Sequence, residues 1–238
     1  MTYLKNWRDI QPQVYHLSAV VWGGWFQPED GGEEEEASPQ VLSGFARHAL
    51  QGRKTSDYHK HENMEQVYYV LSGRGEVLYE DTRYAVEEGD AVYLPSGTHH
   101  QMFNDEENWL EHHVISMKVQ SDGGEFAIRN WRQIAPQGDG GGAMRWRQLG
   151  AEGEEGIGFL RGLSGIEREA LQPRGETGER CHEELEQFYW VLEKSGTLQI
   201  DGRERPITEG DLIHIPAGAT YKIHNPHEQW LSYIIIAI

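Results

Sequence analysis

Residues 58–73, YHKHENMEQVYYVLSG, have the pattern of two strands joined by a short polar turn. His59 and His61 lie two residues apart, and because side chains alternate between the two faces of a strand, both imidazoles are expected on one face. Gln66 lies on the return strand and is expected to place its amide oxygen near the two rings. His100 follows downstream as a third imidazole. Three imidazoles and one amide oxygen that converge in a β-structure suit a divalent transition metal.

This stretch and residues 89–104, GDAVYLPSGTHHQMFN, resemble the two sequence motifs of the cupin superfamily. The first motif runs His-x-His, three or four residues, Glu or Gln, six residues and Gly, and it ends here at Gly73. The second motif runs Gly, five residues, Pro-x-Gly, two residues, His, three residues and Asn, and residues 89–104 match it throughout. The resemblance implies an all-β fold, and it implies metal ligation by His59, His61, Gln66 and His100.

The fourth ligand is the point at which the chain departs from the family pattern. The family most often has Glu there, whereas Gln66 occupies the position when the motif is counted back from Gly73. Glu65 fits if only three residues follow His61, but Gly73 then falls one residue late. We therefore expect Gln66 as the ligand and keep Glu65 as the alternative. Since three imidazoles and an amide carry no charge, the ion would keep its full positive charge.

The motif region is repeated in the second half of the chain. Residues 6–10, NWRDI, recur as residues 130–134, NWRQI, at an offset of 124 residues. Residues 66–71, QVYYVL, recur as residues 187–192, QFYWVL, at an offset of 121 residues. The chain therefore resembles a bicupin, which implies two tandem double-stranded β-helix, or jelly-roll, barrels with domains at residues 1–124 and 125–238.

The second copy is expected to have lost the metal site. At the offset of 121 residues, the four ligand positions hold Arg180, His182, Gln187 and Tyr221. An arginine and a tyrosine are poor replacements for neutral imidazoles in a metal site. These side chains would instead form either a hydrogen-bonded polar plug or a pocket for an anion, and both alternatives stay open.

Other side chains near the first site are candidates for contact with a substrate. Tyr68 shares a strand face with Gln66 and would supply a hydroxyl near the metal, as a catalytic or a substrate-binding group. One of two adjacent histidines after residue 111 should face the barrel interior. The full set of candidate substrate-binding residues is Tyr68, Tyr93, Met102, His112 and His113.

Composition narrows the range of partners and locations. The net charge of −18 argues against a nucleic-acid or an anionic-membrane partner. The single cysteine, Cys181, cannot form an intrachain disulfide. No signal-like N-terminus and no apolar run of membrane-spanning length is present, so we expect a soluble, cytoplasmic protein. We interpret residues 31–39, GGEEEEASP, as a solvated loop or a lid, and residues 14–22 as one strand.

Two functions fit these observations. One is a metal-dependent enzyme of the dioxygenase, isomerase or lyase type, acting on a small oxygen-rich substrate such as a sugar acid, a keto compound or a phenolic compound. The ligand set is similar to that of small cupins that act on unsaturated uronates. The other is a non-catalytic bicupin that binds a sugar or another metabolite and keeps a structural metal, which the lack of an acid/base carboxylate inside the motifs favours. Mixed nitrogen and oxygen ligands fit Fe, Mn, Ni, Zn, Co or Cu, and a homodimer stays open.

Overall fold

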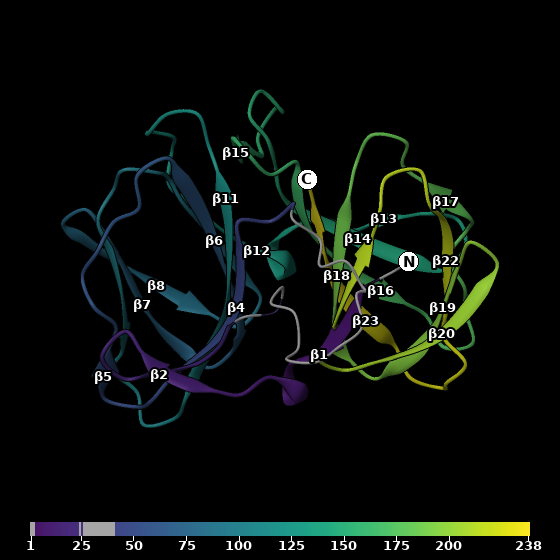
Figure 1. Ribbon diagram of the computed structural model, residues 1–238, viewed down its shortest axis with the longest axis horizontal. Helices are drawn as coiled ribbons and strands as arrows, with labels where there is room; N and C mark the ends of the chain where they lie inside the picture. The colour runs from purple at the N-terminus through teal and green to yellow at the C-terminus, as the bar shows by residue number, and fades with distance from the viewer. Residues whose placement is uncertain (1–2, 24, 26–40) are drawn as a thin grey trace, which may run out of the picture.

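The computed structural model describes residues 3–23, 25 and 41–238, and the acidic segment 31–39 lies outside them. In this part the chain forms strands and two short 3-10 helices, η1 (Trp7–Asp9) and η2 (Trp131–Gln133), arranged as two lobes side by side (Figure 1). The predicted all-β fold with two tandem jelly rolls is confirmed. None of the helices described here is long and apolar enough to cross a membrane.

The first lobe consists of a seven-stranded and a four-stranded sheet. The strand orders are β12-β9-β6-β11-β4-β3-β2 and β5-β10-β7-β8, with antiparallel neighbours throughout. The bounds of these strands are β2 (Gln13–Tyr15), β3 (Ala19–Trp22), β4 (Gly44–Leu50), β5 (Lys54–Thr55), β6 (Met64–Ser72), β7 (Arg74–Tyr79), β8 (Thr82–Glu87), β9 (Asp90–Leu94), β10 (His100–Asn104), β11 (Leu110–Lys118) and β12 (Ala127–Asn130).

The second lobe repeats this plan. Its sheets have the orders β1-β21-β18-β23-β16-β14-β13 and β17-β22-β19-β20, and β15 joins β14 in parallel. The bounds are β1 (Leu4–Asn6), β13 (Gln137–Gly138), β14 (Ala143–Ala151), β15 (Gly158–Leu160), β16 (Gly165–Leu171), β17 (Arg180–Cys181), β18 (Gln187–Glu193), β19 (Ser195–Ile200), β20 (Arg203–Thr208), β21 (Asp211–Ile215), β22 (Thr220–His224) and β23 (Leu231–Ala237).

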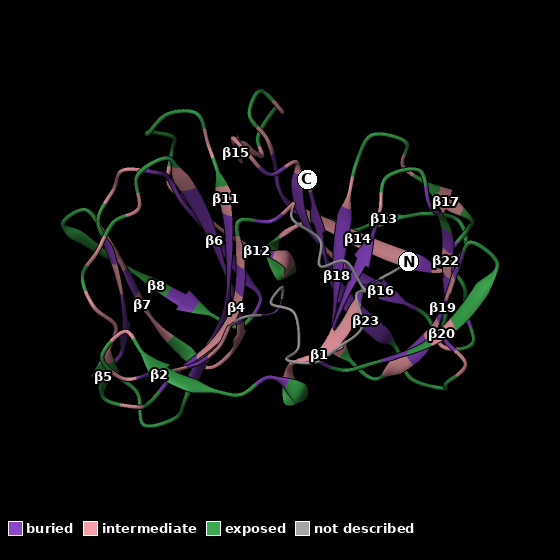
Figure 2. Ribbon diagram, viewed as in Figure 1, coloured by how far each residue is buried: buried purple, intermediate pink, exposed green. Residues whose placement is uncertain are grey.

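The central strands of the large sheets are buried on both faces, and this gives three hydrophobic cores. In β6, Tyr68 and Val70 point into the first lobe, where they join one core. Val67 and Tyr69 point the other way and join a core that also contains Trp190 of the second lobe. A third core fills the second lobe. Figure 2 shows buried strands where the two lobes meet. One hydrophobic core therefore contains side chains from both lobes.

Each lobe also takes one strand from the other half of the sequence. β1 pairs with β21 of the second lobe, and β12 pairs with β9 of the first lobe. Asn6 Nδ2 donates to Asp211 Oδ1 at 2.7 Å, and in the repeat Asn130 Nδ2 donates to Asp90 Oδ1 at 2.8 Å. The domain boundary expected at residue 124 stays a prediction, and these two strands pair across it.

Residues 14–22 form two strands, so the prediction of a single strand is wrong. β2 and β3 make an antiparallel hairpin. Its turn holds His16 at a φ of 51° and Leu17 at a φ of 67°. Few residues other than glycine adopt this left-handed backbone region, so the apolar pattern gave no sign of a turn. The turn brings the His16 imidazole to the first-lobe histidines.

Candidate metal site

The three predicted histidine ligands lie together at one end of the first lobe. His59 and His100 exchange two backbone hydrogen bonds, of 3.2 and 2.8 Å, so the segment before β6 lies along the start of β10. The centroid of the His59 ring is 4.9 Å from that of His61 and 4.6 Å from that of His100. One nitrogen of each ring lies within 4.8 Å of the other two, a grouping that could hold a metal ion.

Backbone carbonyls determine how two of these rings are turned. His59 Nδ1 lies 3.1 Å from the Asp57 carbonyl oxygen, and His100 Nδ1 lies 3.2 Å from the Thr98 carbonyl oxygen. An Nδ1–H that donates to a carbonyl leaves the Nε2 lone pair free, as in most histidine ligands. His100 Nε2 is buried without a hydrogen-bond partner, which is unusual for a polar atom inside a protein. Burial, and then the nearby His59, lowers the pKa of His100 to about 3, so its imidazole is neutral at pH 7.

Gln66 faces the interior of the first lobe, whereas Glu65 faces the second lobe. Gln66 Nε2 donates to Ser116 Oγ at 3.1 Å, and Gln66 Oε1 accepts from the Tyr68 hydroxyl at 3.4 Å. The Tyr68 ring lies 5.9 Å from the His100 ring, so this strand face borders the histidines. The buried Glu65 carboxylate instead accepts hydrogen bonds from backbone N–H groups of the second half. Of the two alternatives, Gln66 shares the strand face that borders the histidines, and Glu65 lies on the opposite face.

A cavity of about 20 Å³, room for about one water, lies beside His59. Three of the predicted substrate-contact residues line it, namely Tyr68, Met102 and His112. Burial raises the pKa of Tyr68, so its hydroxyl stays protonated at neutral pH. Burial, followed by the charge of His113, lowers the pKa of His112 to about 3, so this imidazole is neutral. The cavity wall therefore offers uncharged hydrogen-bonding groups.

Tyr93 and His113 do not line this cavity, and their predicted role as pocket residues is corrected. Strand alternation turns Tyr93 to the face of its sheet that packs against the second lobe. There its hydroxyl donates to Glu65 Oε2 at 3.0 Å. His113 points away from its neighbour His112 for the same reason. Its ring packs 4.1 Å from that of Trp190, in the core between the lobes.

Three residues that the sequence patterns did not indicate lie beside the predicted ligands. The His16 ring lies between those of His48 and His59, at centroid distances of 5.4 and 5.3 Å. His16 Nδ1 is 2.6 Å from Asp57 Oδ1, and His16, Asp57 and His59 form a second grouping that could hold a metal ion. The three residues that were not predicted, His16, His48 and Asp57, stand outside both motifs. The available signal was the concentration of histidines, because eight of the twelve precede residue 114.

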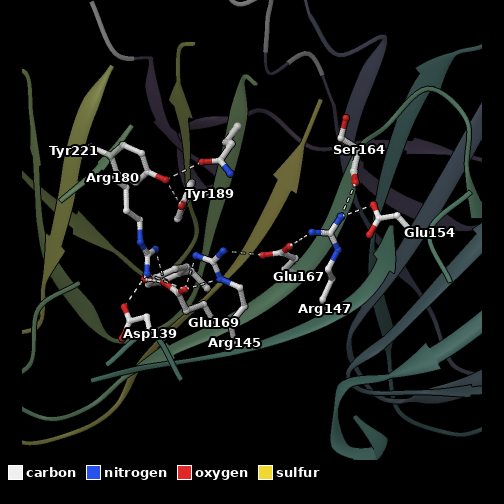
Figure 3. Close-up of polar contacts among 12 residues, drawn as sticks. Asp139, Arg145, Arg147, Glu154, Ser164, Glu167, Glu169, Arg180, Tyr189 and Tyr221 are labelled. Atoms are coloured by element: carbon white, nitrogen blue, oxygen red, sulfur yellow. Dashed lines mark hydrogen bonds and ion pairs between the residues drawn. The ribbon is translucent and has the colours of Figure 1, made fainter. Parts of the chain in front are cut away.

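The equivalent position in the second lobe is filled by an ion-pair network (Figure 3). Arg180 donates to the two Glu169 oxygens at 2.8 and 3.0 Å and to Asp139 Oδ2 at 3.1 Å. Arg145 Nε donates to Glu169 Oε2 at 2.8 Å. The Glu169 side chain is 1% exposed and the Arg180 side chain 11%, so both charges are largely removed from water.

Hydroxyl groups extend this network across the second lobe. The Tyr221 hydroxyl donates to Gln187 Oε1 at 2.8 Å and lies 2.7 Å from the Tyr189 hydroxyl (Figure 3). His182 Nε2 is buried and makes no hydrogen bond. This arrangement agrees with the polar plug, one of the two predicted alternatives. Within the described part of the chain, both groupings that could hold a metal lie in the first lobe.

Comparison with known proteins agrees with the duplicated architecture. A family model described as Cupin domain matches residues 47–115 and again residues 167–237. An uncharacterised protein of Methanocaldococcus jannaschii is 39% identical over 46 residues. That match spans 19% of this chain and 37% of the other protein's length.

Solved structures extend the likeness over nearly the whole chain. The putative glyoxylate induced protein of Pseudomonas aeruginosa superposes with a TM-score of 0.78 at 15% identity, over 100% of this chain and 89% of that one. The protein Ylba of E. coli gives a TM-score of 0.73 at 14% identity, over 99% and 90%. An oxalate decarboxylase of Bacillus subtilis gives 0.75 at 13% identity, over 98% and 76%. At these identities the likeness shows a shared fold.

Proposed function

We propose, from the premise that this chain belongs to the cupin domain family, that its first lobe is a metal-dependent enzyme for a small oxygen-rich substrate. The observation that carries the proposal is the grouping of His59, His61 and His100 together with the unpartnered, buried His100 Nε2. Gln66 would complete the ligand set with its amide oxygen. A neutral set of this kind fits Fe, Mn, Ni, Zn, Co or Cu. The Bacillus subtilis oxalate decarboxylase has Mn(II) centres, which makes Mn one ion to test first.

The charges around the site favour an anionic oxygen on the substrate. When bound, a divalent ion supplies Lewis acidity and, if it is redox-active, oxidation chemistry. Because none of the four proposed ligands carries charge, a carboxylate or an enediolate would compensate the ion. Tyr68 would donate its O–H to a substrate oxygen, since burial keeps its pKa high. Met102 and His112 would shape the wall of the pocket. Sugar acids, keto acids and phenolic acids meet these requirements, for isomerase, lyase or dioxygenase chemistry.

A second candidate function is binding without turnover. The cavity-lining residues include no carboxylate, so no acidic side chain is placed there for proton transfer. The nearby Asp57 carboxylate is paired with His16. A protein that holds a metabolite on a structural metal would need no such group.

Two measurements test these functions. Elemental analysis of protein purified without added metal should give about one transition-metal ion per chain for the wild type, much less for His100→Ala and an unchanged value for His99→Ala. The matched control is informative because the His99 ring stacks on exposed Tyr58, at 4.7 Å, and not on the other histidines. Consumption of a uronate, keto acid or phenolic acid by the metal-loaded protein would support the enzyme. Saturable binding without consumption would support the binding protein, and a well-folded wild type without metal would overturn both.

A further inference from the structure

We infer that the second lobe, which has an ion-pair network in place of a metal site, positions the ligands of the first lobe through residues 161–163. We call these three residues the clamp. The inference rests on the proposed metal site, and it assigns a role to residues outside both motifs. It follows from two sets of hydrogen bonds that run from the clamp to the segments carrying His61 and Gln66.

The first set holds the strand that carries Gln66. Glu65 precedes it, is fully buried, and accepts three backbone N–H groups of the clamp, from Arg161 at 2.8 Å, Gly162 at 2.8 Å and Leu163 at 2.7 Å. The Tyr93 hydroxyl adds a fourth hydrogen bond at 3.0 Å. Hydrogen bonds to an ionised carboxylate are about twice as strong as neutral ones, so this strand is tied firmly to the second half of the chain.

The close approach of the clamp requires glycine at its centre. A Cβ on Gly162 would lie 2.8 Å from Met117 Cγ, 2.9 Å from the Lys118 carbonyl oxygen and 3.2 Å from Glu65 Oε1. Side chains essentially never approach so closely, so any other residue would push the clamp away from the carboxylate. Gly165, four residues from Arg161, provides a contrast, because the nearest atom to its added Cβ would be 3.7 Å away.

The second set begins at the Arg161 guanidinium. Its Nη1 donates to the carbonyl oxygens of Ser121, Asp122 and Gly123 at 3.0, 3.2 and 3.1 Å, and its Nη2 donates to Ser121 Oγ at 3.0 Å. The Arg161 side chain therefore binds three consecutive carbonyl groups of the segment that joins the two halves of the chain. This fixes the position of the Asp122 side chain, which faces the first lobe.

Asp122 continues the path to the turn that carries His61. Its Oδ1 accepts the Asn63 backbone N–H at 2.8 Å and lies 2.5 Å from Ser96 Oγ. Both hydrogen bonds lower the pKa of the Asp122 carboxyl, which keeps it ionised. Ser96 Oγ accepts the Met64 N–H at 2.9 Å, and the next residue, Gly97, donates its N–H to the His61 carbonyl at 2.7 Å. The turn at residues 61–64 is thus held at three points.

Among the described residues, the second lobe repeats one of these contacts, because the Gly218 N–H donates to the His182 carbonyl oxygen at 2.8 Å. Glu186 corresponds to Glu65, but its carboxylate pairs with the side chain of His214, at 2.5 Å. Ala217 corresponds to Ser96 and has no hydroxyl. The clamp therefore contacts the lobe that contains the three histidines. Glu186 can serve as a control for Glu65, because it stands at the equivalent position of the second lobe.

The test compares Glu65→Gln and Gly162→Ala with the matched controls Glu186→Gln and Gly165→Ala. Glu65→Gln places an amide N–H against backbone N–H donors, and Gly162→Ala moves the clamp without changing Glu65. Titration calorimetry with Mn²⁺ and with Zn²⁺ should show about 10- to 100-fold weaker binding for both clamp variants, the range for groups that orient metal ligands. The controls should match the wild type.

Hydrogen exchange on metal-free protein separates this inference from the metal proposal. Backbone amides at residues 61–66 should exchange faster in the clamp variants than in the wild type and the controls. Exchange and affinity equal to the wild type in both clamp variants would overturn the inference. A wild type that binds neither ion would overturn the proposed metal site, and the exchange rates would still decide whether the clamp holds the segment. If Glu65→Gln does not fold, Gly162→Ala alone gives the answer.

Discussion

Removal of one carboxylate charge in the second lobe should destabilise the protein strongly. The Glu169 side chain is 1% exposed, and its oxygens accept from Arg180 at 2.8 and 3.0 Å, from Arg145 at 2.8 Å and from the Tyr233 hydroxyl. Glu169→Gln keeps the size of the side chain but leaves the buried Arg180 charge without its main partner. Loss of one member of a buried pair costs about 3–5 kcal/mol. Since Asp139 still pairs with Arg180, at 3.1 Å, we expect the lower end, about 3 kcal/mol.

Urea unfolding at pH 7, followed by circular dichroism, measures this cost. The double variant Glu169→Met with Arg180→Met should be less destabilised than Glu169→Gln, because both buried charges are gone. The control Glu209→Gln removes an exposed partner of Arg8 and should change the free energy of unfolding by less than about 1 kcal/mol. A loss below about 1 kcal/mol for Glu169→Gln, or a double variant as unstable as the two single variants together, would refute the buried-charge reasoning.

Three further predictions concern the first lobe and the contact between the halves. His100→Ala should lose the bound transition metal while His99→Ala keeps it, as elemental analysis would show; equal metal content in both would contradict the site. His112 has a folded-state pKa of about 3 against 6.5 unfolded, so the unfolded chain takes up the proton first and stability falls as the pH drops below 6.5. Between pH 7 and pH 5 the wild type should therefore lose about 2 kcal/mol more than His112→Asn, measured by urea midpoints, and parallel losses would argue against a neutral buried imidazole. Gly210→Ala should cost about 1–3 kcal/mol more than Gly202→Ala, because both have positive φ but only at Gly210 would the Cβ meet an indole, at 2.5 Å; equal thermal midpoints would show that the indole moves aside.

The residues that could be predicted from the sequence are those whose neighbours are close in the chain or fixed by a motif. His59 and His61 share a strand face by their spacing, and His100 follows from the second motif. The sequence does not show that Tyr93 lies outside the pocket, because a fully buried strand is apolar on both faces and does not indicate which face points inward. His16 was missed because its position depends on a left-handed turn at a residue that is not glycine.

The ion-pair partners of Arg180 in the second lobe could not be predicted from sequence patterns, for a different reason. Arg180 and Tyr221 identified the loss of the metal site, because the repeat aligns them with two histidines. Their ion-pair partners come from other strands, and Glu169 stands at the position of His48, whose own role was also unforeseen. No local spacing relates Glu169 to Arg180. Only the closed sheets bring them together.

The exchange of β1 and β12 between the lobes is a domain swap made within a single chain. In two separate copies of the repeated unit, the same exchange would tie each protomer to its partner and would depend on protein concentration. Fusion makes the encounter intramolecular, at an effective concentration of about millimolar or more, so the pair stays assembled at any dilution. In a fused chain the two repeated units also need not keep the same sequence. One member could give up its histidines for Arg180 and Glu169 and still be retained, because the other cannot complete its sheet without it.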